Sequence, residues 1–425
     1  MSEEATLNDF ADQDDSGSSN ADKSDEGWPI KKLSDHIELV SGVHVKSDNV
    51  HSNDGGTPYL TGPEDFEGLG FTVTKYTDEP TKYTEPSDTL VTVKGSGCGK
   101  TAFSDQRACI SRQLKALRPD SSINPLYLYY TISREEPFLE TLSEGSAIPG
   151  LSNSHLTTLD VPVPDIEEQL KIASILYNVD QAIQKTEDII GQTNKTKEGV
   201  LQELFTTGYY DHTNFKKTRV GELPKSWKLD KIKNHVELVS GAHVKSDLVS
   251  DDDSLSPYLT GPEDFDEFGF TVTKYTSEPT KFCEPEDTLV TVKGSGCGKS
   301  TYAIQRACIS RQLKALRPKD SLEPLYLFYF IKTKQNLLEN LAEGSAIPGL
   351  SNSHLTTLDI PIPNPEEQRE IADTLREIDR TIEHENKYRN QLQFLKKGLM
   401  QDLLSGTVRT TDTNIEVLPE VVQHG

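Results

Sequence analysis

The chain has 425 residues, a formal net charge of −24 at pH 7 and five cysteines. This length allows two or three domains with real cores. The lack of an apolar run of about 18 residues predicts no transmembrane span and no membrane partner. The odd number of cysteines and the lack of a C-x-x-C pair argue against a disulfide framework or a zinc site, and the sequence shows no other metal-ligand cluster.

Acidic residues are concentrated at the start of the sequence. Residues 1–27 contain nine acidic residues and one lysine, with neither a basic start nor an apolar stretch. This composition predicts a disordered acidic tail rather than a signal peptide, and a cytoplasmic protein. The overall acidity disfavours a non-specific nucleic-acid binder, unless the negative surfaces lie away from the partner.

A tandem repeat organises the rest of the chain. The segment "ELVSGVHVKSD" from Glu38 recurs as "ELVSGAHVKSD" from Glu237, and "QRACISRQLKALRP" from Gln106 recurs unchanged from Gln305. Both pairs are offset by 199 residues. One large unit is therefore duplicated, which differs from a solenoid of short repeats.

Each copy begins with a module rich in Val, Thr, Tyr and Phe and in Gly and Pro turns. The first module spans residues 28–164, and the second follows a linker within residues 208–363. Runs such as "TLVTV" and "FTVTKY" predict short strands, so we expect a mixed α+β module built mostly of strands. The segment "PLYLYYTI" from Pro125 suits a strand or a helix that continues through "EEPFLETL", and we favour the helix.

A long helix is predicted after each module, over residues 165–207 and 364–406, and a C-terminal tail follows at 407–425. Each helix opens with Glu-Glu-Gln, whose acidic side chains suit the positive end of a helix. Apolar residues then recur in steps of four and three, as in a coiled coil. The residues assigned to this seam are Ile172, Leu176, Val179, Ile183, Leu204, Ile371, Leu375, Ile378, Ile382 and Leu403.

These elements predict an α+β fold class. Two similar mixed α/β modules are separated by two long coiled-coil helices. Because the tandem repeat can create a pseudo-two-fold axis across the helices, we expect them to pair antiparallel.

The stretch "TLVTVKGSGCGKT", from Thr89 to Thr101, and its second copy from Thr288 to Ser300 are similar to a phosphate-binding loop. The Walker pattern needs a glycine five positions before the Gly-Lys pair, and Lys94 stands there instead. The residues that follow the loop also favour strands over a helix. A nucleotide-binding enzyme is therefore disfavoured, although glycines that expose backbone N–H groups between lysines suit the phosphates of a nucleic acid.

Basic residues gather after each glycine loop, with Asp105 as the one acid from Lys94 to Arg118. Small polar residues in two further repeated loops suit base edges or phosphates. The sequence shows no catalytic triad and no paired carboxylates, so it predicts a DNA reader without catalytic residues. The candidate DNA-binding residues are Lys46, Lys94, Ser96, Lys100, Arg107, Arg112, Ser152, Asn153 and His155, with Lys245, Lys293, Ser295, Lys299, Arg306, Arg311, Ser351, Asn352 and His354 in the second copy.

The order and duplication of these motifs resemble the specificity subunit of a type I restriction-modification enzyme. The matching segments include "DTLVTVKGSGCGKTAF", "GSAIPGLSNSHLTTLDVPVPDIEEQLKIASIL" and "VGELPKSWKLDKI". The resemblance implies that each module is a target-recognition domain, which reads one half of a split site in double-stranded DNA. It also implies that the helices set the spacing and dock two DNA methyltransferase subunits.

The resemblance places cofactors in partner subunits and none in this chain. The methyltransferases would bind S-adenosylmethionine and methylate adenine, and restriction subunits would use ATP with Mg²⁺ for translocation and cleavage. Family members usually carry two dissimilar modules, whereas these are near twins, so we expect a bipartite site that is close to palindromic. The alternatives are a P-loop-like nucleotide-binding enzyme and a scaffold whose twin modules bind protein or glycan.

Overall fold

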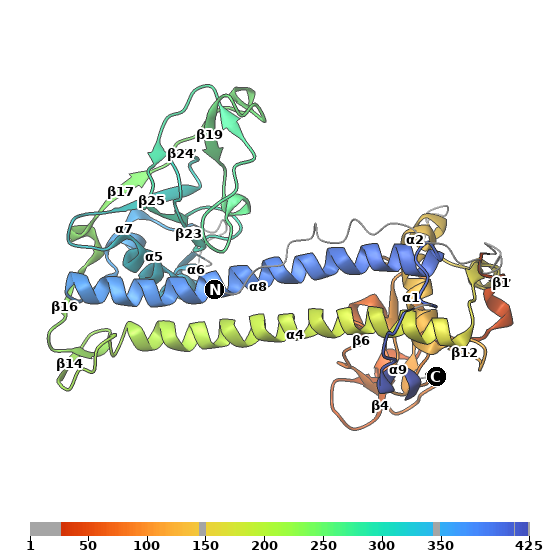
Figure 1. The fold of residues 1–425 in the computed structure, drawn as a ribbon. Helices are drawn as coiled ribbons and strands as arrows, with labels where there is room; N and C mark the ends of the chain where they lie inside the picture. Colours follow the sequence, from red (N-terminus) through yellow and green to blue (C-terminus); the bar gives the residue numbers. More distant parts are fainter. Residues whose placement is uncertain (1–26, 144–149, 343–348, 412, 424–425) are drawn as a thin grey trace, which may run out of the picture. The chain divides into compact units, whose positions relative to one another are not determined.

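The computed structural model describes residues 27–143, 150–342, 349–411 and 413–423, and the predicted acidic tail up to residue 26 lies outside them. The chain forms two compact units. Unit 1 comprises Met1–Ala182 with Phe394–Gly425, and unit 2 comprises Ile183–Gln393. Figure 1 shows that each unit combines a module of strands and short helices with parts of the two long helices.

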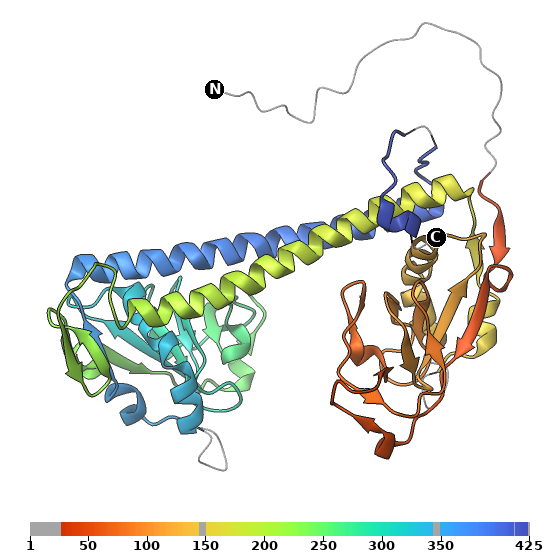
Figure 2. The ribbon, with the colours of Figure 1, turned by 90° about the horizontal axis from the view of Figure 1, so that it is seen from below.

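Unit 1 contains two main sheets (Figure 2, red to orange). One has the antiparallel order β10-β9-β12-β2, and the other has the order β3-β7-β4-β11-β8, in which β4 and β11 are parallel. The strands are β1 (Ile30–Lys32), β2 (Ile37–Ser41), β3 (Val50–His51), β4 (Thr57–Leu60), β5 (Phe66–Glu67), β6 (Gly70–Phe71), β7 (Tyr76–Thr77), β8 (Tyr83–Thr84), β9 (Thr89–Thr92), β10 (Thr101–Phe103), β11 (Ala108–Ile110), β12 (Leu114–Pro119) and β13 (Asp160–Pro162).

The short helices of unit 1 are α1 (Pro125–Arg134), α2 (Glu136–Ser143), α3 (Asn153–Thr157) and α9 (Pro419–Gln423). Asn124 caps α1, because its side chain accepts a hydrogen bond from the Tyr127 N–H at 3.0 Å. The helix predicted from Pro125 is therefore present. It is divided at Glu135, which forms the C-cap of α1. Lys334 divides the equivalent helix of the second copy in the same way, although Asn336 replaces Pro137 there, so the proline is not required for the break.

Unit 2 repeats this architecture, with sheet orders β17-β25-β22-β23 and β18-β20-β19-β24-β21. Its strands are β14 (Phe215–Thr218), β15 (Gly221–Pro224), β16 (Lys228–Lys231), β17 (Val236–Ser240), β18 (Val249–Ser250), β19 (Ser256–Leu259), β20 (Tyr275–Thr276), β21 (Phe282–Cys283), β22 (Thr288–Thr291), β23 (Ser300–Tyr302), β24 (Ala307–Ile309), β25 (Leu313–Pro318) and β26 (Asp359–Ile362). Its short helices are α5 (Pro324–Thr333), α6 (Gln335–Ala342) and α7 (Asn352–Thr356).

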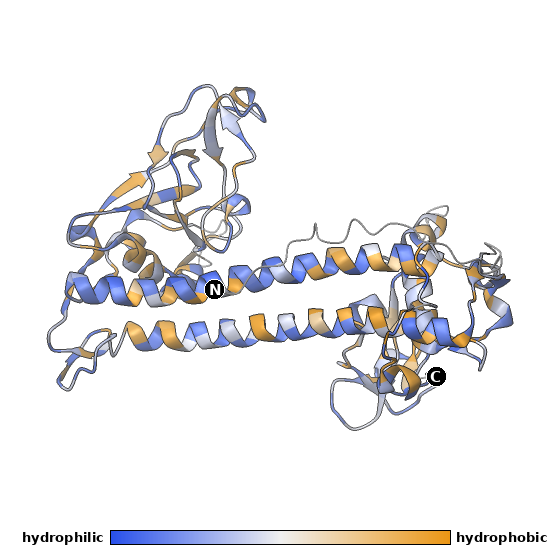
Figure 3. Ribbon diagram, viewed as in Figure 1, coloured by the Kyte–Doolittle hydropathy of each residue, from blue (hydrophilic) through white to orange (hydrophobic). Residues whose placement is uncertain are grey.

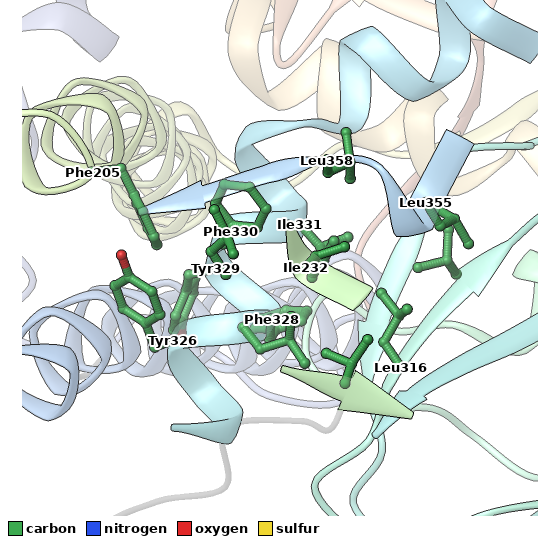
Figure 4. Close-up of a cluster of buried hydrophobic side chains, with 14 of the residues drawn as sticks. Phe205, Ile232, Leu316, Tyr326, Phe328, Tyr329, Phe330, Ile331, Leu355 and Leu358 are labelled. Carbon is green, nitrogen blue, oxygen red and sulfur yellow. The ribbon is translucent and has the colours of Figure 1, made fainter. Parts of the chain in front are cut away.

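An aromatic cluster on α5 forms the core of unit 2 (Figure 4). Tyr326, Phe328 and Phe330 are all buried, and the Tyr326 ring centroid lies 4.8 Å from that of Phe205, just after the end of α4. Because α5 packs on both the sheet and the long helices, the module is attached to the helices through its hydrophobic core.

The long helices are α4 (Ile166–Leu204) and α8 (Pro365–Ser405). Within unit 1, Leu176 near the start of α4 shares a core with Leu403 near the end of α8. Within unit 2, Leu204 at the end of α4 shares a core with Leu375 near the start of α8. The paired segments therefore run in opposite directions in both units, as predicted. The combination of these helices with the strand-rich modules confirms the predicted α+β fold class.

Apolar residues recur along both long helices (Figure 3). Among the ten residues assigned to the coiled-coil seam, Val179, Ile183 and Ile378 are half-buried. The other seven are buried: Ile172, Leu176, Leu204, Ile371, Leu375, Ile382 and Leu403. Within the described ranges, no helix combines the length and the apolar character needed to cross a membrane.

The segment after α8 packs on unit 1. Val421 of α9 is fully buried, and its carbonyl accepts a hydrogen bond from the Asn124 amide at 3.1 Å. Arg409 forms a bidentate pair with the buried Glu168, at 2.9 Å for both bonds. Arg409 and α9 are therefore part of the folded structure of unit 1.

Candidate nucleic-acid interface

The glycine loop of each module is the turn of a β-hairpin. In unit 1 it joins β9 to β10, which pair antiparallel with Val91 opposite Thr101. The Gly99 N–H donates to the Thr92 carbonyl at 2.8 Å, and the Lys100 N–H donates to the Gly97 carbonyl at 3.1 Å. These two amides are not free for a phosphate, so of the loop glycines Gly99 does not offer the exposed N–H that was expected. A strand follows the loop, which departs from the strand-loop-helix context of a Walker site.

Two of the glycines allow close packing around this turn. Gly97 has φ +81°, and a Cβ there would lie 2.9 Å from Pro63 Cγ. Gly99 has φ +98°, and a Cβ there would lie 3.0 Å from the backbone nitrogen of Glu140 in α2. The repeated glycines therefore have a structural reason, since other residues would strain the backbone and clash.

Three polar side chains of the loop, by contrast, are free. Lys94, Ser96 and Lys100 are exposed and have no side-chain hydrogen bond or ion pair within the described residues. In unit 2, Lys293, Ser295 and Lys299 are exposed in the same way. Exposed lysines on a hairpin tip can bind phosphate groups through their charge.

A lysine that is buried in unit 1 and half-buried in unit 2 lies behind each loop. Lys115 donates to Ser41 Oγ at 2.8 Å and also to Asn153 Oδ1. Burial lowers the pKa of Lys115, and repulsion from Lys94 lowers it further. In unit 2, Lys314 donates to Ser240 Oγ at 2.7 Å, and burial followed by repulsion from Lys293 lowers its pKa as well. Each pair of lysines favours an anion beside it.

Other basic residues of the two islands are paired with acidic side chains, on the surface for Arg107 and with a buried carboxylate for Arg118. Arg107 lies 3.1 Å from Glu85 and stacks over the Tyr83 ring at 3.8 Å. Arg118 forms two hydrogen bonds with Asp88, which is buried. The counterparts in unit 2 are Arg306 with Glu284 and Phe282, and Arg317 with Asp287. The positive charge available to a ligand is therefore smaller than the sequence islands indicate.

The candidate residues Ser152 and His155 stabilise a short helix. Ser152 Oγ accepts from the His155 N–H at 3.3 Å, and the Ser152 N–H donates to His155 Nδ1 at 3.3 Å, so the two residues cap α3. Ser351 and His354 cap α7 in the same way. The Asn153 side chain accepts a hydrogen bond from Lys115. Its counterpart Asn352 is exposed, and within the described residues its side chain has no hydrogen-bond partner.

Arg112 lines a pocket of about 380 Å³ in unit 1. Lys46 is exposed in the chain segment beside it, and Arg311 and Lys245 are exposed in unit 2. Sequence reasoning did not select the other polar residues of this pocket, among them Tyr59, Lys75 and Gln113. Their unchanged repetition 199 residues later is the signal that could have found them. Within the described ranges, no group of three or more His, Cys, Asp and Glu side chains is placed to hold a metal ion.

Comparisons with known proteins agree with this arrangement. The chain is 28% identical over 415 residues to the type I restriction enzyme MjaVIII specificity subunit of Methanocaldococcus jannaschii, covering 92% of this chain and 95% of that protein. The crystal structure of the type I restriction-modification S subunit from M. genitalium has the same fold, with a TM-score of 0.62, 17% identity, and coverage of 90% of this chain and 98% of that one.

A chain solved in work on assembly and conformational transition of the type I R-M system also shares the fold. Its TM-score is 0.58 at 18% identity, with 91% of this chain and all of that chain covered. The family model "Type I restriction modification DNA specificity domain" matches residues 25–192 and 224–393, so both modules and most of the helices are included. The chain is therefore a member of the type I restriction-modification DNA specificity family, with two copies of its domain.

Proposed function

We propose that this chain reads a bipartite site in double-stranded DNA, one half with each module, and that it docks subunits that methylate and cleave the DNA. The observation that carries this proposal is the repetition of the same exposed loop side chains, Lys94, Ser96 and Lys100, as Lys293, Ser295 and Lys299. Free lysines on two matched hairpins suit phosphates in two halves of one DNA site.

The proposed site is close to an interrupted palindrome. Near-identical modules read related sequences, and the opposite directions of the paired helix segments in each unit support an inverted order of the two half-sites. This is the symmetry that a pseudo-two-fold protein shares with DNA that has two matching half-sites.

The proposed partners are two DNA methyltransferase subunits and restriction subunits with translocase activity, which meet the chain in the cytoplasm. Exposed apolar side chains on the long helices support docking there: Phe394 is 80% exposed, and Leu395 and Ile189 are 49% and 46% exposed. S-adenosylmethionine, and ATP with Mg²⁺, would be bound by these partners. The catalytic groups would be theirs as well.

Methylation mapping tests this proposal. The chain is co-produced with its partner methyltransferase, and methylated adenines are mapped in the host DNA. We expect an interrupted motif with two related, inverted halves. A strongly asymmetric motif would contradict the palindromic site. A loss of all site-specific methylation and of any gel shift on duplex DNA would favour a protein- or glycan-binding scaffold.

A further inference from the structure

A polar pocket adjoins the glycine loop in unit 1. It has a volume of about 380 Å³ and is lined by ten residues, among them His44, Tyr59, Thr61, Lys75, Arg112 and Gln113. Arg112 and Gln113 lie on the turn that joins β11 to β12. A Cβ at Gly95 would lie 3.4 Å from Gln113 Oε1, so this amide is next to the hairpin that carries the exposed lysines.

The wall of this pocket is held by internal hydrogen bonds. Ser111 Oγ donates to the Thr61 carbonyl at 2.6 Å, and Lys75 Nζ donates to Thr61 Oγ1 at 3.0 Å. The Tyr59 hydroxyl accepts from the Val45 N–H at 3.4 Å. These bonds connect β4, the β2–β3 loop and the β11–β12 turn, which makes the wall rigid before any ligand arrives.

Three polar side chains of the pocket are not used in this way. His44, Arg112 and Gln113 have no side-chain hydrogen bond or ion pair within the described residues. His44 and Arg112 are exposed, and Gln113 is half-buried. The lining includes two basic residues and no Asp or Glu, in a chain with a net charge of −24. The pocket therefore combines a fixed wall with free donors and acceptors.

The Arg-Gln pair suits the edge of a purine. A guanidinium can donate two hydrogen bonds to guanine O6 and N7, and a carboxamide can both donate to adenine N7 and accept from adenine N6. We propose that Arg112 and Gln113 are base-reading residues, which recognise purine edges in one half-site from this pocket. This inference rests on the proposed function, since it takes the DNA site as given and assigns residues that read it.

The second module has the same pocket residues. All ten lining residues recur with unchanged identity 199 positions later, including Arg311 and Gln312. The Ser310 hydroxyl donates to the Thr260 carbonyl at 2.5 Å, as Ser111 does to Thr61. The nearby loop differs by contrast, with "HSNDGGT" at 51–57 and "SDDDSLS" at 250–256. The two pockets would therefore recognise the same bases, once in each half-site. Contacts from the loops at 51–57 and 250–256 could still differ between the half-sites.

Single-module variants of the full chain test this inference, with methylation mapping of the assembled enzyme as the readout. Gln113→Glu keeps the size of the side chain but removes its donor, and a carboxylate prefers the cytosine amino group. The preference at one position of one half-site should fall about tenfold or more and shift from purine towards cytosine. Gln312→Glu should produce the same change in the other half. Gln106→Glu is the matched control, because it introduces the same charge at an exposed site outside the pocket in the same module.

The unaltered half-site reports on folding and assembly in each variant. A motif that stays the same in both halves for Gln113→Glu and Gln312→Glu overturns the base-reading assignment and leaves the proposed function intact. An equal loss in both halves from either variant also overturns it. If the parent chain directs no site-specific methylation, the proposed function fails, and this inference fails with it.

Discussion

Lys396 on α8 forms an ion pair with Asp180 on α4, with 2.6 Å between Nζ and Oδ1. The second oxygen of Asp180 accepts a hydrogen bond from the Tyr130 hydroxyl on α1 at 2.7 Å. Burial, followed by the charge of Asp180, raises the pKa of Tyr130 well above its ordinary value, so this hydroxyl remains a donor. One carboxylate thus joins the module to both long helices.

Unit 2 contains the same triad with the helices exchanged. Lys197 on α4 pairs with Asp379 on α8, and Asp379 accepts from the Tyr329 hydroxyl on α5 at 2.6 Å. Each residue is offset by 199 from its counterpart, yet each lysine comes from the other copy of the helix. This exchange follows from antiparallel pairing of two repeated helices.

Asp180→Asn should destabilise unit 1 by about 2 kcal/mol. The change leaves the half-buried ammonium group of Lys396 without a counter-charge, which costs more than the net energy of the pair. Asp188→Asn is the control, because Asp188 is exposed on the same helix, and it should change stability by less than about 0.5 kcal/mol. Urea unfolding of the full chain measures both variants, and equal midpoints would show that the ion pair adds nothing.

Arg409→Ala should weaken the attachment of the segment after α8 and make the stability of unit 1 less dependent on acidic pH than that of the parent. Burial by itself would raise the pKa of Glu168, but hydrogen bonds from Arg409, Thr410 and Trp28 outweigh it and hold that pKa below the ordinary value. A carboxyl group with a lowered folded pKa stabilises the protein above its unfolded pKa, and this contribution is lost as the pH falls.

The variant should therefore lose about 2 kcal/mol at neutral pH and less below the folded pKa of Glu168. Unfolding curves measured at neutral and acidic pH test this. Arg380→Ala serves as the control, since Arg380 is exposed and its ion pair with Glu377 lies on the surface of α8. A loss that stays constant with pH would contradict the electrostatic account.

Lys332→Ser should remove a pH dependence from unit 2. Burial, with repulsion from Lys197, lowers the pKa of Lys332 from 10.5 to about 8. Between these values the unfolded chain holds a proton that the folded chain has released, so this lysine makes stability rise with pH.

Ser133 stands at the equivalent position of unit 1, so serine is compatible with this site. The variant should be more stable than the parent near pH 8 by on the order of 1 to 3 kcal/mol, and this advantage should shrink towards pH 10.5. Denaturant midpoints across this range measure it, with the exposed Lys319→Ser as control. An advantage that grows with pH would refute the prediction.

Glycine-to-alanine changes should have opposite signs on the helix and in the hairpin. Gly199 in α4 and Gly398 in α8 have no atom within 4 Å of a built Cβ, so alanine should stabilise each helix by about 0.5 to 1 kcal/mol. Gly97→Ala should destabilise its hairpin, because of the positive φ and the contact with Pro63. Thermal unfolding of the three variants separates these effects, and a common sign would contradict the assigned geometry.

Lys94→Glu combined with Lys293→Glu should weaken DNA binding and flatten its dependence on salt. If each lysine contacts one phosphate, the slope of log affinity against log salt should fall by about 0.9 for each contact. Filter binding of the assembled complex at several salt concentrations measures the slope. Lys31→Glu with Lys228→Glu is the matched control, as both lysines are exposed outside the glycine loops. An unchanged slope would remove Lys94 and Lys293 from the phosphate contacts.

The sequence by itself determined the repeated architecture. The 199-residue offset, the β-branched runs and the spacing of residues such as Ile172 and Leu176 depend only on local order, and they predict two strand-rich modules and two long helices. A lysine at position 94, where the Walker pattern requires glycine, is likewise enough to disfavour a nucleotide-binding loop. Local patterns suffice for these features because periodicity reports which face of an element is buried.

Only the tertiary structure decided which charges are available to a ligand. Arg107 and Arg118 belong to the same sequence islands as Lys94, but Glu85 and Asp88 reach them from a neighbouring strand and turn and neutralise them. Gln113 is repeated as Gln312, but this repetition does not show what lies around its side chain, which lines a pocket together with Tyr59 of β4 and Lys75. Charge pairing and pocket walls depend on contacts between distant segments, which the order of residues along one chain does not reveal.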